Sequence, residues 1–107
     1  MSDPDHEAAS PPLEEGWVRE QRDYRGVSRR LTAHYLRNLG GELVGTDDPS
    51  AATRVDGDGW RATLSAETVA VAGSITLTEV TVSFAGEPEV LDELIADFTL
   101  KAMRAGG

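Results

Sequence analysis

The sequence contains no cysteine, and this absence excludes three kinds of site at once. Disulfide bonds, catalytic thiolates and thiolate metal centres all require that residue. The stability of the protein therefore has to come from one packed hydrophobic core. Such a chain suits a reducing compartment, where disulfide bonds are rare.

Positive charge is scarce. Lys101 is the only lysine, and together with nine arginines it faces nineteen acidic residues, which gives a formal net charge of -9 at pH 7. Nucleic acids are bound mainly by Lys and Arg placed against phosphates, so we expect no nucleic acid partner. Acidic residues repel one another in dilute buffer, whereas in molar salt the screening length falls to about 3 Å. The composition therefore predicts a salt-rich, haloarchaeal cytoplasm.

Long apolar runs are also absent, because none approaches the roughly 18 residues that a membrane span needs. The first residues carry Asp3, Asp5 and Glu7 where a signal peptide has basic and then apolar residues. We therefore expect no membrane partner and a cytoplasmic location. Residues 1–15 are rich in Pro, Ser, Ala and acids, so we expect a disordered acidic tail followed by one domain of residues 16–107.

Two segments show the apolar spacing of a helix. Leu31, Tyr35 and Leu39 are four residues apart and predict a helix over residues 29–39. Pro88 predicts the start of a second and longer helix, because proline suits the first helical turn and acidic residues surround it there.

The remaining apolar residues predict strands. Residues 74–84 form the longest strand, and their apolar positions are odd-numbered up to Leu77 but even-numbered from Val80. This change of phase predicts a β-bulge near Thr78 and Glu79, or a strand that bends from one neighbour to another. The other predicted strands are residues 16–24, 42–44, 53–55 and 60–65, the last with a continuation to Val71. The order β-α-β-β-β(-β)-α predicts a two-layer α+β domain, in which a curved, mainly antiparallel sheet is covered on one face by both helices.

Three carboxylates have part of the spacing of a calcium loop. Asp56, Asp58 and Glu67 would occupy positions 1, 3 and 12 of that loop. Trp60 and Arg61 then occupy positions 5 and 6, where an oxygen ligand and a glycine are required. The segment is more typical of a β-hairpin, so we predict no metal site.

Catalytic groups do not form a recognisable set. His34 has no second histidine at helical spacing, and we interpret it as a boundary residue of the first helix. Serine and threonine are common, but the Gly-x-Ser-x-Gly motif and the phosphate-binding loop are missing. We therefore predict no catalytic residue, no cofactor and a protein that is not an enzyme.

One region of the chain is locally basic. Arg22, Arg25, Arg29 and Arg30 lie within a short stretch before and at the start of the first predicted helix. Guanidinium groups bind phosphates and carboxylates through paired hydrogen bonds, so these residues are candidates for an anion site. The alternative is that they form ion pairs with the many carboxylates of the protein itself.

The final residues, Gly106 and Gly107, suggest two alternative roles. Small ubiquitin-like and sulfur-carrier proteins end in two glycines, which enter the groove of an activating enzyme before the terminal carboxylate is adenylated and converted to a thiocarboxylate or amide. Alternatively, these glycines only end the last helix, as glycine often does. Known carriers place the diglycine on an extended tail after a strand, whereas here only Ala105 separates it from Arg104 near the end of a helix.

Several short motifs between Val27 and Gly107 together suggest a family. They are Ser28-Arg29-Arg30, Leu39-Gly40-Gly41, Gly59-Trp60-Arg61 and the final segment Lys101-Ala102-Met103-Arg104-Ala105-Gly106-Gly107. This part of the chain resembles the small C-terminal domain of some proteins related to the molybdopterin synthase small subunit (MoaD-related proteins). The resemblance implies an α+β domain associated with molybdenum-cofactor biosynthesis and sulfur transfer. The ubiquitin-like domain that precedes it in those proteins is replaced here by the acidic tail, so the resemblance implies an accessory or interaction role.

Two functions follow from these observations. The first is a non-enzymatic accessory or carrier-like protein that docks on a protein partner, with the C terminus as a contact. The alternative is a self-associating module, such as a homodimer, or a module that binds a small ligand. In the alternative, the exposed sheet face or the region from Arg22 to Arg30 would form the contact.

The charge excess predicts how stability depends on salt. We expect the melting temperature to rise steeply between dilute buffer and molar KCl, because screening removes the repulsion among the carboxylates. Thermal unfolding followed by circular dichroism at several KCl concentrations measures this effect. A melting temperature that does not respond to salt would contradict the halophilic interpretation.

Overall fold

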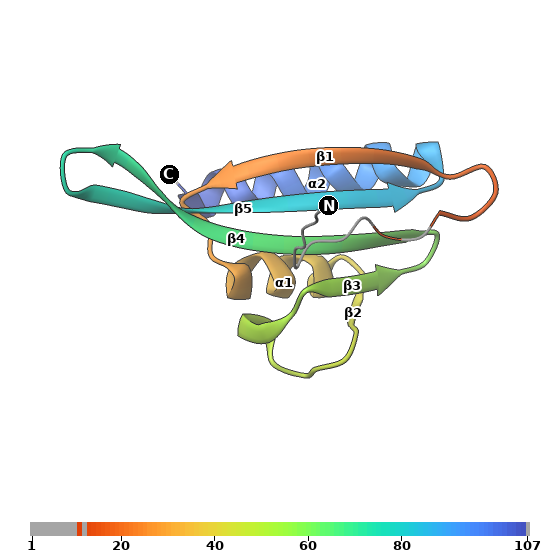
Figure 1. Cartoon of the computed structure of the whole chain (residues 1–107). Coiled ribbons are helices and arrows are strands. Elements are labelled where there is room, and N and C mark those ends of the chain that lie inside the picture. Colours follow the sequence, from red (N-terminus) through yellow and green to blue (C-terminus); the bar gives the residue numbers. More distant parts are fainter. Residues whose placement is uncertain (1–10, 12, 107) are drawn as a thin grey trace, which may run out of the picture.

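The computed structural model describes residue 11 and residues 13–106, which form an antiparallel sheet with helices on one of its faces (Figure 1). The sheet has the strand order β1-β5-β4-β3-β2. This arrangement confirms the predicted α+β fold. In chain order the elements are β1 (Val18–Arg25), α1 (Arg29–Asn38), β2 (Glu42–Leu43), the short 3-10 helix η1 (Pro49–Ala51), β3 (Arg54–Gly57), β4 (Trp60–Ala72), β5 (Ile75–Gly86) and α2 (Pro88–Gly106).

The core lies between the sheet and α2. On β5, Val80, Val82 and Phe84 alternate toward the helices and are fully buried. Their cross-strand partners on β4 are small or aliphatic, such as Leu64 opposite Val82. The helix α2 contributes its own apolar stripe at helical spacing. Its buried members are Leu91, Leu94, Ile95, Phe98 and Ala102.

The helix α1 begins and ends as its sequence predicts. The Ser28 hydroxyl accepts a hydrogen bond from the Leu31 amide at 3.0 Å, which satisfies one free donor of the first turn. After the helix, Gly40 adopts a φ of 106°, a conformation that glycine tolerates. Leu36 is fully buried in the core, and the rings of Tyr35 and Phe98 lie 6.3 Å apart. Both helices therefore cover the same face of the sheet, which we call the helix face.

The predicted β-bulge near Thr78 and Glu79 is wrong. β5 pairs with β1 without interruption from Glu79 to Gly86, and its pairing with β4 is regular across Thr78. The irregularity lies instead in β4, between Ala70 and Ala72. Apolar residues change phase because they belong to opposite faces of the strand: the odd-numbered ones point away from the helices, where Ile75 is 61% exposed. No extra residue is needed to explain the pattern.

β4 and β5 are much longer than their neighbours. β1 pairs with β5 only from Glu79 onward, and β3 pairs with β4 only up to Thr63. Beyond these points residues 67–78 form a two-stranded ribbon that projects past the rest of the sheet (Figure 1). We call this ribbon the hairpin arm.

The face of the sheet opposite the helices, which we call the open face, is partly covered by the segment before β1. The Arg19 side chain on β1 donates a hydrogen bond to the Pro11 carbonyl at 3.0 Å. Arg61 on β4 pairs with Glu14. Between these two arginines, Ala85 of β5 is fully buried. The predicted disorder covers residues 1–15, of which residues 1–10 and 12 lie outside the described residues.

The helices of the described part of the chain are α1, η1 and α2. None of them combines the length and the apolar character that crossing a bilayer requires.

One polar contact joins the two layers and can be tested. The Tyr24 hydroxyl on β1 lies 3.0 Å from the Thr99 hydroxyl on α2, and burial of Tyr24 raises its pKa. We expect Tyr24→Phe to lower the free energy of unfolding by about 1 kcal/mol, the usual contribution of one such hydrogen bond. The ring of Tyr24 would keep its edge contact with Phe98 at 4.9 Å.

The control for this experiment is a double-mutant cycle with Thr99→Val, measured by urea unfolding in molar KCl. If the two hydroxyls bond to each other, the double variant is no less stable than either single variant. Fully additive losses would show that the bond does not contribute.

Candidate functional site

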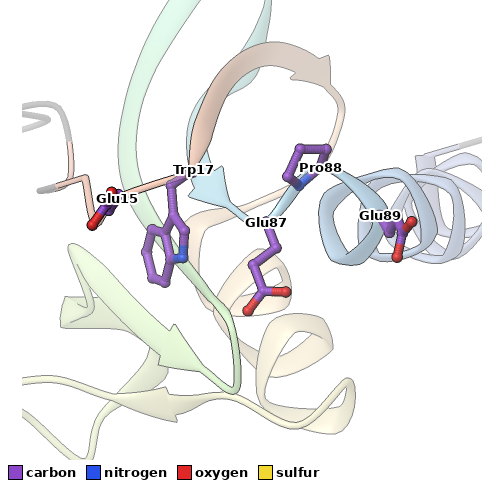
Figure 2. Close-up of a pocket in the computed structure, with 6 residues that line it drawn as sticks. Glu15, Trp17, Glu87, Pro88 and Glu89 are labelled. Carbon is purple, nitrogen blue, oxygen red and sulfur yellow. The ribbon is translucent and has the colours of Figure 1, made fainter.

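One end of the sheet brings together the start of β1, the end of β5 and the start of α2. Val18 pairs with Gly86, which places Trp17 next to Glu87. Figure 2 shows the Trp17 indole and the Glu87 carboxylate pointing in the same direction, with Glu15 beyond the indole and Glu89 farther along the helix. A pocket of about 380 Å³ opens here, which we call the acidic pocket. Its lining residues are Glu15, Gly16, Trp17, Glu87, Pro88 and Glu89.

A close backbone contact fixes the position of Glu87. The Glu87 amide donates to the carbonyl of Gly59, in the turn between β3 and β4, at 3.1 Å. Gly86 makes this approach possible, since a Cβ at that position would lie 2.6 Å from the Gly59 oxygen and 2.9 Å from the Trp60 Cβ. The Glu87 carbonyl then accepts the Leu91 amide at 2.9 Å, which starts α2. The pocket wall is therefore held by the main chain.

The other wall is held by an aromatic contact. The Arg61 guanidinium lies 4.8 Å from the centre of the Trp17 ring, a cation–π distance. Arg61 also pairs with Glu14, and the Trp17 amide donates to the Glu14 carbonyl at 3.0 Å. These contacts hold the half-buried indole over the edge of the sheet.

The chemistry of the acidic pocket is that of a cation-binding surface. Its charged side chains are three carboxylates, and an indole face attracts cations. Glu15, Glu87 and Glu89 are the ionisable residues of its lining. Among residues 11 and 13–106, no group of three or more His, Cys, Asp or Glu side chains could hold a metal ion. The pocket can accept an ammonium or guanidinium group.

The sequence did not single out Trp17 and Glu87. From the sequence alone, Trp17 indicates only the start of a strand, and Glu87 indicates only an acid near the positive end of a helix dipole. Their proximity depends on the pairing of Val18 with Gly86, across most of the length of the chain. The one local signal was a tryptophan placed at the end of an acidic segment.

The predicted anion site is not assembled at a single point. Arg22 and Arg25 lie on opposite faces of β1, because side chains alternate along a strand. Arg22 forms an ion pair with Glu20 at 2.6 Å, although its geometry is not that of a hydrogen bond. Arg25 forms an ion pair with Glu79 at 3.1 Å. These two contacts match the alternative of internal ion pairing.

The two arginines at the start of α1 differ from each other. Arg29 donates to the carbonyls of Ala52 at 2.8 Å and Leu64 at 3.2 Å, so it joins α1 to β4 and to the segment between η1 and β3. Arg30 is exposed. Anion binding by these residues stays a prediction, and the contacts of Arg29 point to a structural role.

The calcium-loop carboxylates lie apart. Both oxygens of Asp56 accept hydrogen bonds from Arg54, at 2.8 and 2.9 Å. Glu67 lies on β4 six residues beyond Arg61, the cross-strand partner of Asp56, which corresponds to about 20 Å along a strand. His34 is exposed, and its Nε2 lies 3.3 Å from the side-chain Nδ2 of Asn38.

The two terminal glycines are only partly described. Gly106 belongs to the last turn of α2, and Gly107 lies outside the described residues. The helical course of the chain through Gly106 differs from the extended tail of known carriers. Both roles of Gly106 and Gly107, as the terminus of a carrier protein or as the end of the last helix, stay predictions.

The close approach at Gly86 gives a test of how the pocket is built. We expect Gly86→Ala to lower the free energy of unfolding by about 1–3 kcal/mol, since the new methyl group forces the turn at Gly59 to move. Ser74→Ala, in the exposed turn of the hairpin arm, should change it by less than about 0.5 kcal/mol. Urea unfolding measures both variants, and equal stabilities would contradict the tight packing at this end.

Comparison with known proteins identifies the family. A family model described as archaeal MoaD-like protein matches residues 20–107. No curated protein and no solved structure gives a significant match to the chain. The matched region includes the whole of the core and all but the first residues of the sheet. Because the match covers most of the chain, as the short motifs predicted, the protein belongs to the family of archaeal MoaD-like proteins.

Proposed function

We propose that this protein is a non-enzymatic accessory protein of sulfur transfer, linked to molybdenum-cofactor biosynthesis in a halophilic archaeon. The observation that carries this proposal is the family match over residues 20–107. The chemistry of the acidic pocket supports a docking role, because three carboxylates beside an indole attract a cationic group. The accessory protein acts in the cytoplasm by docking on a protein partner.

The acidic pocket supplies the docking contact in this proposal, and its occupant is a Lys or Arg side chain of the partner. Trp17 already holds one guanidinium, that of Arg61, at 4.8 Å from the ring centre. The volume of about 380 Å³ is sufficient for one long basic side chain. Attraction between such a group and the three carboxylates gives orientation and specificity to the complex.

The C-terminal end gives the protein a carrier-like feature. Gly106 lies in the last turn of α2, where the final carbonyl groups have no hydrogen-bond partner within the helix. The last turn therefore opens at little cost, and an opened turn would present an extended end to an activating enzyme. This feature is separate from the acidic pocket, because the 19 residues of α2 span about 28 Å.

Charge reversal tests the docking contact. We expect Glu87→Lys to weaken the complex with a sulfur-transfer protein roughly tenfold, because a like charge then meets the basic group of the partner. The measurement is co-purification from the native host in molar salt, with partners identified by mass spectrometry, followed by affinity measurement on the purified pair.

The matched control is Asp92→Lys, which makes the same change of charge at an exposed position of α2. It should leave affinity unchanged. Equal loss in both variants would show that net charge alone matters, and partners unrelated to sulfur transfer would contradict the proposed pathway.

Deleting Gly107 distinguishes a role of the C terminus from a role of the acidic pocket. We expect partner binding through the acidic pocket to persist, while formation of a thiocarboxylate by an activating enzyme, ATP and a sulfur donor is lost. Intact-protein mass spectrometry detects the exchange of oxygen for sulfur, and Met103→Ala in the exposed part of α2 serves as the control. Loss of partner binding on deletion would place the docking contact at the C terminus and reject the acidic pocket.

A further inference from the structure

We propose that the hairpin arm, residues 67–78, associates with the hairpin arm of a second copy of this protein. The two arms pack against each other through their open faces. This inference is independent of the acidic pocket, which lies at the opposite end of β4 and β5.

The open face of the arm is apolar. Val69 and Leu77 are direct cross-strand partners, and Ile75 follows on the same side of β5. Leu77 is 39% exposed and Ile75 is 61% exposed. Thr76 lies between them and points to the other face, because side chains alternate along the strand. One face of the arm therefore carries aliphatic side chains, with Glu67 at the base of the arm, and the other carries Thr68, Ala70, Thr76 and Thr78.

This ribbon lacks the layer that normally supports a hairpin. The helices cover the sheet only as far as Val80 on β5, which is fully buried, whereas residues 70–78 are all exposed. In the described part of the chain, no strand flanks residues 67–78 on either side. A two-stranded hairpin without a packed face is at best marginally stable in water. A second apolar layer over Val69, Ile75 and Leu77 would supply the missing support.

The charge distribution identifies the occupant as a second copy. Residues 68–78 form the longest stretch of the sequence without a charged side chain, in a protein of net charge -9. Two such molecules repel each other over most of their surfaces, so they can approach closely only through neutral regions. A basic partner would instead be attracted by the acidic surfaces elsewhere. The nearest carboxylates, on Glu67 and Glu79, lie at the base of the arm, and Arg25 pairs with Glu79.

Symmetry fits this arrangement. In a two-fold dimer each arm presents the same apolar patch to the other, so one self-complementary surface completes both ribbons. Because each copy uses the same patch in this contact, the assembly stops at two copies. Molar salt favours this dimer because it screens the repulsion between the acidic bodies of the two molecules.

Sedimentation velocity over a dilution series in molar KCl tests the proposal. We expect the wild-type protein to dimerise and Leu77→Glu to weaken dimerisation at least roughly tenfold, because it places an unpaired charge in the contact. Thr76→Glu introduces the same charge on the same strand but on the other face, and should dimerise as the wild type does. Both side chains lie outside the core, so cooperative thermal unfolding of each variant confirms that it folds.

A wild-type protein that stays monomeric throughout the series would overturn the proposal. Equal weakening by Leu77→Glu and Thr76→Glu would overturn the assignment of the contact to the open face.

The absence of cysteine allows a second, independent measurement. A single cysteine introduced as Ile75→Cys can form a disulfide only between two copies, and we expect rapid cross-linking under mild oxidation. Thr76→Cys, one residue away and on the opposite face, should cross-link at least roughly tenfold more slowly, since disulfide geometry requires Cβ atoms about 4 Å apart. Equal rates at the two positions would reject packing through the open faces.

Discussion

The antiparallel pairing of β4 with β5 is the constraint on which the rest of this structure depends. It runs from Trp60 opposite Gly86 to Ala72 opposite Ile75. Its inner half is covered by α2 and forms the core, and its outer half extends beyond every other element as the hairpin arm. At its inner end Glu87 lies against the turn at Gly59, and the pairing of β1 with β5 places Trp17 beside Glu87. One pair of strands therefore defines both the packed body and the two surfaces that are available for partners.

Local sequence signals predicted the elements well, because short-range chemistry determines where they begin and end. Ser28 caps α1, glycine ends it, and the two-residue turn Asp58-Gly59 joins β3 to β4, with Gly59 at a φ of 81°. In these cases the residue that fixes the conformation lies within a few positions of the element. The same signals correctly ordered the strands and helices in a two-layer arrangement.

Non-local features were harder to predict from the sequence. The apolar phase change in β5 indicated a bulge only on the assumption that all its apolar residues face one core. In the structure Leu77 and Val80 lie on opposite faces of a regular strand, and α2 covers only the face of Val80. The acidic pocket was missed for a similar reason, since Trp17 and Glu87 meet through strand pairing between distant segments. Arg22, Arg25 and Arg29 are close in the sequence. In the structure Arg22 and Arg25 lie on opposite faces of β1, and Arg29 donates to two carbonyl groups.

Charged and apolar surface side chains gather at opposite ends of the β4–β5 pair. The acidic pocket at one end offers carboxylates to a cationic group, and the arm at the other end offers neutral aliphatic side chains. In molar salt the electrostatic attraction at the first surface weakens, whereas burial of apolar area at the second is not screened. A contact with the Trp17 indole also has a hydrophobic component, which remains when salt screens the attraction of the carboxylates. The same reasoning explains why the neutral arm can join molecules whose remaining surfaces repel each other.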